Sequence, residues 1–174
     1  MSKQLSVSRC EIVEVSGLSD ATGDRCTRVA DGQCSDCGTL ICELHTENCD
    51  INTAQVTYQS QFPNLGYASA LSQLGPTAST GCTTPTSAAS CLLDYVLSNA
   101  TAATKPKSGY YFTVPATVTG GGINVDFTVN GLPAAAGQTG VRGFCSNSDG
   151  VIRYNNPAAA AASNSACAGL TALQ

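Results

Sequence analysis

Apolar residues follow helical spacing in the middle of the chain. In INTAQVTYQSQF, residues 51–62, they recur near that spacing, and Pro63 follows directly. Because proline cannot continue a helix, we expect a helix to end there. The stretch YASALSQLG predicts a second, short helix that turns Leu71 and Leu74 inward and ends at a glycine–proline pair.

A third helix is predicted by CLLDYVLSNA, residues 91–100. Cys91 lies near its expected start, and the apolar positions share one helical face. These positions are Leu92, Leu93, Val96 and Leu97.

The last third of the chain changes to the alternation of apolar and polar residues that is typical of half-buried strands. GYYFTVPA and INVDFTVNG are two such segments, the second with strict alternation at Ile123, Val125, Phe127 and Val129. The triple glycine at 120–122 lies between them and predicts a turn. GVRGFCS and GVIRYN flank the turn residues NSDG and predict a hairpin. Four β-segments that follow the helices, rather than alternating with them, indicate an α+β fold with an antiparallel sheet.

The composition changes near residue 50 and divides the chain into residues 1–50 and 51–174. The first part holds nine of the 12 acidic residues, six of the 10 cysteines and the single histidine. The second part is rich in alanine, threonine, serine, glycine and asparagine and has little charge. Such a surface is more typical of extracellular or filament-forming proteins than of cytosolic enzymes. We therefore expect a small Cys/His-rich module followed by a globular domain.

The overall charge argues against two classes of partner. The formal net charge is -4, and no run of basic residues is present. Nucleic acids and anionic membrane surfaces are bound through basic patches. No stretch is apolar and long enough for a signal-peptide core or a membrane-spanning helix. We expect a soluble chain with no visible export signal, no nucleic-acid partner and no membrane insertion.

The order of segments in residues 51–174 resembles the globular part of a bacterial type IV pilin or pseudopilin of the acidobacterial type. The matching residues are INTAQVTYQSQFPNLGYASALSQLG, a cysteine-containing loop, CLLDYVLSNAT, KSGYYFTV and GQTGVRGFCSNSDGVIRYN. The resemblance implies a helix packed on a four-stranded antiparallel sheet, with a variable loop between them. It also implies disulfides between Cys82 and Cys91 and between Cys145 and Cys167. Spacing alone leaves other pairings, and four free thiols, open.

One feature of that family has no counterpart in this sequence. Pilins carry a short basic leader and then a long apolar helix, which anchors the subunit and later forms the filament core. The acidic, cysteine-rich residues 1–50 lie in that place. We therefore expect a pilin-like subunit or accessory component of a type IV pilus or related secretion system, without this assembly helix. Its expected partners are other pilin-type subunits or a separate helical pilin subunit, at the cell surface.

The first part concentrates potential metal ligands in CSDCGTLICELHTENC, residues 34–49. It contains two pairs, Cys34 with Cys37 and Cys42 with His45, whose spacing suits a tetrahedral zinc ion. The candidate ligands are Cys10, Cys26, Cys34, Cys37, Cys42, His45 and Cys49. The two pairs are too close in sequence to share one ion, so we expect a cross-braced arrangement. One ion would take Cys10, Cys26, Cys42 and His45, and the other Cys34, Cys37, Cys49 and a further donor such as Asp50.

The segment CSDCGTLICELH is similar to small treble-clef or B-box-like zinc modules, which implies a structural metal. A closed zinc site suits a module with few large apolar residues, because metal binding supplies free energy of folding. Three disulfides among the six cysteines are one alternative. A redox role for Cys34 and Cys37 is the other.

No arrangement of residues indicates an enzyme. His45 is the only histidine, so residues 51–174 have no such base to activate their serine and threonine hydroxyls. We expect a structural or interaction protein. The alternative is a cytosolic zinc-binding adaptor or redox-sensing module with a repurposed pilin fold. Disulfides in the second part favour the exported component, and free thiols there favour the cytosolic alternative.

Overall fold

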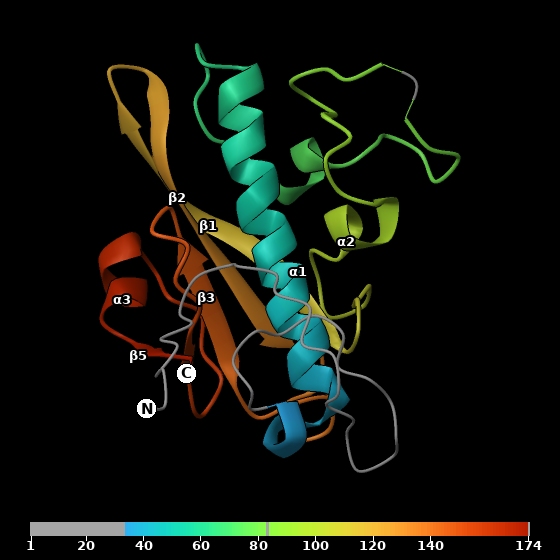
Figure 1. The fold of residues 1–174 in the computed structure, drawn as a ribbon, viewed down its shortest axis with the longest axis vertical. Helices are drawn as coiled ribbons and strands as arrows, with labels where there is room; N and C mark the ends of the chain where they lie inside the picture. The colour runs from blue at the N-terminus through green and yellow to red at the C-terminus, as the bar shows by residue number, and fades with distance from the viewer. Residues whose placement is uncertain (1–33, 83, 174) are drawn as a thin grey trace, which may run out of the picture.

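A long helix packs on an antiparallel sheet in the computed structural model, which describes residues 34–82 and 84–173 (Figure 1). Side chains of α1 are described from Thr46 onward. The elements are α1 (Cys34–Gln61), η1 (Leu71–Leu74), α2 (Tyr95–Asn99), β1 (Tyr110–Gly120), β2 (Ile123–Pro133), β3 (Gly143–Asn147), β4 (Arg153–Asn155), α3 (Asn164–Ala168) and β5 (Thr171–Ala172). The coarse prediction of an α+β fold with an antiparallel sheet is confirmed.

The sheet is a meander in the order β1-β2-β3-β4-β5, and each strand is antiparallel to its neighbour. The expectation of four strands is corrected to five. The fifth comes from the C-terminal tail, where Thr171 pairs with Tyr154 and Leu173 N donates to Ile152 O. A two-residue strand is too short to leave a periodic signal in the sequence, because alternation needs several residues to appear.

Helix α1 buries one face against the sheet. Ile51, Ala54 and Tyr58 lie at helical spacing on that face and are all buried. The helix ends at Gln61, as Pro63 predicts. It begins at Cys34, so the change of composition near residue 50 falls inside a continuous helix.

The sheet has a core on each of its faces, because successive residues of a strand point to opposite sides. Phe127, Val129 and Phe144 belong to the core that also contains the buried face of α1. On the other face, Cys145 clusters with Ala161 and Cys167 near α3.

Two polar side chains of α1 fix its position within the apolar core. Gln55 accepts a hydrogen bond from Ala68 N at 2.8 Å and donates to Ala68 O at 3.1 Å. Asn52 Oδ1 accepts from Ser146 Oγ on β3 at 3.0 Å. Buried polar groups need partners, so these bonds fix α1 against the connection at Ala68 and against β3.

The two shorter helical predictions differ in outcome. The prediction for Leu71 and Leu74 is confirmed, since both are buried in η1. Helix α2 starts only at Tyr95, because Asp94 caps it by accepting hydrogen bonds from Val96 N and Leu97 N at 2.8 and 3.0 Å. The apolar residues predicted to share one helical face differ in burial, since Leu93 and Leu97 are buried and the side chain of Val96 is 55% exposed.

Strand β2 shows why strict alternation overestimated burial. Phe127 and Val129 are buried as predicted, whereas Ile123 and Val125 are exposed. β3 pairs with β2 only from Thr128 onward, so the first residues of β2 have β1 as their single neighbouring strand. The β1–β2 hairpin thus projects beyond the body of the sheet (Figure 1).

Candidate functional site

The predicted metal ligands lie only partly within the described structure. Cys10 and Cys26 lie outside the described residues, as do the side chains of the other ligands in α1 before residue 46. These are Cys34, Cys37, Cys42 and His45. Their backbone belongs to helix α1. Among the described side chains, no group of three or more potential ligands gathers.

Cys49 is the one candidate ligand whose side chain is described. It is buried, and its sulfur takes part in a disulfide bond. A disulfide sulfur carries no thiolate charge to offer a metal. At this position the structure therefore favours the disulfide alternative.

Zinc at the other six positions stays a prediction. Elemental analysis of the purified chain, combined with a count of its free thiols, tests it. One or two zinc ions per chain support a metal module. All ten cysteines oxidised, with no metal, would exclude it.

Both disulfides implied for the second part are present. Cys82 pairs with Cys91 with a Cα–Cα distance of 5.8 Å, and Cys145 pairs with Cys167 at 5.9 Å. The first closes the loop between η1 and α2, and the second ties α3 to β3. A disulfide stabilises mainly by restricting the unfolded chain, so both bonds are expected to stabilise this part of the chain.

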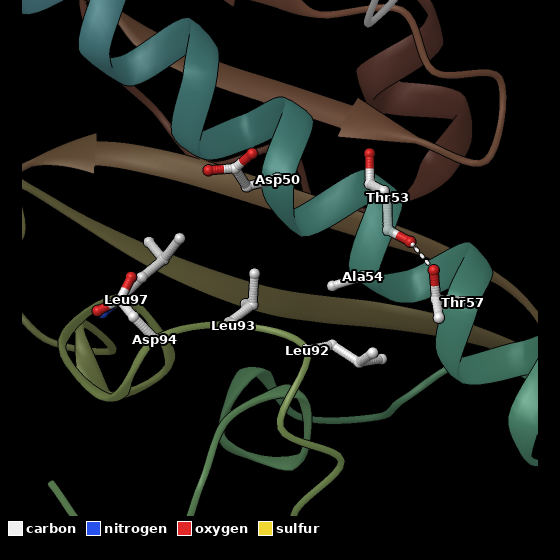
Figure 2. A pocket seen from close by; sticks show the side chains of 8 residues that line it. All are labelled: Asp50, Thr53, Ala54, Thr57, Leu92, Leu93, Asp94 and Leu97. Carbon is white, nitrogen blue, oxygen red and sulfur yellow. Dashed lines mark hydrogen bonds between the residues drawn. The ribbon is translucent and has the colours of Figure 1, made fainter. Parts of the chain in front are cut away.

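A groove between α1 and the segment leading into α2 is the candidate site for an interaction (Figure 2). Its volume is about 290 Å³. It is lined by Asp50, Thr53, Ala54, Thr57, Leu92, Leu93, Asp94 and Leu97. The first four come from α1 and the last four from the opposite wall.

Local structure explains both walls of this groove. Asp50, Thr53, Ala54 and Thr57 recur at the spacing that places residues on one helical face. Thr57 donates to Thr53 O at 2.9 Å, so this hydroxyl is bound to the helix backbone. On the opposite wall, the carboxylate of Asp94 serves as the cap of α2 and so remains at the rim.

The groove combines apolar and acidic side chains. Leucine side chains supply an apolar wall, and Asp50 and Asp94 contribute carboxyl groups to the lining. An aliphatic side chain with a basic end is the group that this combination fits.

Tyr58 anchors the loop beside this site. Its hydroxyl donates to Ser87 O at 2.7 Å. Burial raises the pKa of this hydroxyl above its ordinary value of 10.0, so it stays neutral and remains a donor. The loop is thereby held to α1 independently of its disulfide.

Sequence reasoning missed the groove. In the sequence, Asp50 was considered only as a possible zinc donor, and Thr53 and Thr57 were not identified as candidate site residues. Their spacing from Asp50 is a usable signal, because it places them on one face beside the buried face of α1. The opposite wall has no comparable signal, since its position follows from the packing of a loop.

Comparisons with known protein families, with curated proteins and with solved structures find no match for this chain. Within the described residues, no helix has the length and apolar character required to cross a membrane.

Proposed function

We propose that this chain is a structural or interaction protein, a pilin-like subunit or accessory component of a type IV pilus or related secretion system at the cell surface. Its expected partners are pilin-type subunits. The observation that carries the proposal is the combination of α1 packed on an antiparallel meander with disulfides at the two cysteine pairs that the pilin resemblance implies.

The disulfides also weigh against the cytosolic alternative. Structural disulfides persist in oxidising compartments and are rare in the cytosol. Cys145 and Cys167 are both fully enclosed, so their bond belongs to the folded core. Such a bond stabilises the folded domain by restricting the unfolded chain.

The groove between α1 and α2 supplies a contact surface for the proposed partner. It is lined by leucine side chains and by Asp50 and Asp94, and the exposed residues Tyr95 and Val96 lie between two of its lining residues, Asp94 and Leu97, in the sequence. We expect a partner subunit to insert an aliphatic side chain that ends in a basic group. Such a contact buries apolar area and pairs charge at the rim, which favours specificity.

Site-specific photo-crosslinking in the cells that produce the full chain tests this proposal. A photoreactive residue replaces Val96 beside the groove, and in a matched variant it replaces Val141, which is 57% exposed in the connection between β2 and β3. We expect the Val96 variant to crosslink to a pilin-type subunit and the Val141 variant to do so far less. Recovery of the chain only from the cytosol, with free thiols at Cys82 and Cys145 and no pilin-type partner, would overturn the proposal.

A further inference from the structure

The two disulfides of the second part differ in their access to solvent. Cys145 is 1% exposed and Cys167 is 0% exposed, and Ala161 and Leu170 pack against them. Cys82 is exposed and Cys91 is half-buried. An external thiol can approach the Cys82 sulfur in the folded protein, whereas it reaches the other pair only when the cluster around Cys145 opens.

Cys91 is held in place by hydrogen bonds on both sides of it. Ser90 N donates to Gln73 O at 2.8 Å, and Leu92 N donates to Leu74 O at 2.7 Å. Between them Cys91 has a φ of 62°, a left-handed conformation that is unfavourable for a residue with a side chain. These bonds run to η1 and do not involve Cys82, so the Cys91 backbone keeps its anchors when the disulfide opens.

The chain around Cys82 has no such support. Residues 77–82 are exposed, and so is Thr84. Within the described structure, the single backbone hydrogen bond of residues 77–82 joins Gly81 N to Ala78 O. Anchoring resumes at Thr86, which exchanges backbone hydrogen bonds with Ala89, and at Ser87 beside Tyr58. Opening the disulfide would therefore release Cys82 and its neighbours and leave the core intact.

We propose that the Cys82–Cys91 bond is a reversible thiol–disulfide exchange site for a dithiol reductant. Cys82 is the sulfur that is attacked, and Cys91 is the anchored thiol that closes the bond again. This inference goes beyond the proposed function and does not depend on the partner in the groove.

The exchange proceeds in two balanced steps. A thiolate of the reductant attacks Sγ of Cys82, a mixed disulfide forms, and the Cys82–Cys91 bond breaks. The electron pair leaves on Sγ of Cys91, which takes a proton from water. The second thiol of the reductant then displaces Cys82, so two electrons pass to the protein and the reductant becomes a disulfide.

Release of Cys82 alters the surroundings of the groove. Cys91 directly precedes Leu92 and Leu93, which form part of the wall opposite α1. With the disulfide closed, the loop that carries Cys82 is tethered one residue from that wall. Opening the bond removes this tether.

Graded reduction of the purified full chain tests the proposal. The chain is equilibrated with increasing dithiothreitol, free thiols are trapped with N-ethylmaleimide, and labelled peptides are assigned by mass spectrometry. We expect Cys82 and Cys91 to be half-labelled at a dithiothreitol concentration about tenfold below that for Cys145 and Cys167. Far-ultraviolet circular dichroism should keep its native form after this selective step.

A brief exposure to glutathione separates the roles of the two cysteines. We expect the glutathione adduct on Cys82 and a free thiol on Cys91. The Cys82→Ser/Cys91→Ser variant is the matched control, in which Cys145 and Cys167 should become labelled as in the native chain. Opening of the Cys145–Cys167 pair at the same or a lower reductant concentration, or an adduct on Cys91, would overturn the proposal. The native chain decides both points even if the variant does not fold.

Discussion

Gln55 provides the sharpest test of how α1 is held in place. Its side chain is fully buried, and its amide pairs with both backbone groups of Ala68, which is also buried. The amide therefore acts as a neighbouring strand would, by satisfying one N–H and one C=O group. Gln55→Leu keeps a side chain of similar size but leaves both backbone groups of Ala68 without a partner.

The expected loss of stability follows from these two groups. A buried neutral group without a hydrogen bond costs about 1–3 kcal/mol, so the pair costs about 2–6 kcal/mol. Burial of a leucine in place of an amide offsets part of this, by about 1.5–3 kcal/mol at most. We expect a net decrease in the free energy of unfolding of about 1–3 kcal/mol.

Urea unfolding without reductant measures this change, because the disulfides then stay closed in both states. With an m-value of about 2 kcal/mol per molar, the midpoint should fall by about 0.5–1.5 M at unchanged slope. Gln61→Leu is the matched control, since Gln61 lies on the same helix but is exposed. It should change the free energy of unfolding by less than about 0.5 kcal/mol. If Gln55→Leu is as stable as the control, the bonds to Ala68 do not position α1 and our reasoning is wrong.

Three further predictions concern the core. In the Cys145→Ala/Cys167→Ala variant, the free energy of unfolding in urea should fall by about 3 kcal/mol, because the disulfide spans a sequence separation of 22. An unchanged urea midpoint would contradict this. Ile51→Ala should lower the free energy of unfolding by about 2–5 kcal/mol in the same assay, whereas Val56→Ala on the exposed face of α1 should hardly change it. Equal effects of the two substitutions would refute the assigned buried face of α1. Burial raises the pKa of Tyr58 above 10.0 in the folded protein, so its contribution to stability is full below that pH and is lost as pH rises through the folded pKa. The urea midpoint should therefore fall with alkaline pH less steeply in Tyr58→Phe than in the native chain.

Much of the fold could be predicted from local patterns. Pro63 places the end of α1, because proline removes a backbone donor and cannot continue a helix. The glycines at 121 and 122, both with positive φ, form the two-residue turn between β1 and β2, which matches the turn expected from the triple glycine. Alternation after residue 108 identified the strands themselves. These features depend on a few neighbouring residues, so the sequence carries them directly.

The candidate site shows where local patterns fail. The start of α2 was placed at Cys91, whereas Asp94 caps the helix three residues later. The cysteines of the second part were identified, but their pairing came from the pilin resemblance and not from spacing. The groove was missed because one of its walls is a loop. The position of this loop depends on backbone hydrogen bonds to η1, which cannot be predicted from a local sequence pattern.

The sequence by itself determined the class of the fold, the order of its main elements and the residues able to form disulfides. Those properties follow from backbone preferences and side-chain chemistry at single positions. Only the tertiary structure decided which apolar residues are buried. Val125 and Val129 share one strand and one face, yet only Val129 is buried, because β3 pairs with β2 at Val129 and does not extend to Val125. It also decided that the Cys82–Cys91 pair meets solvent while the Cys145–Cys167 pair does not. Exposure depends on what packs against a residue, and that is a property of distant segments brought together.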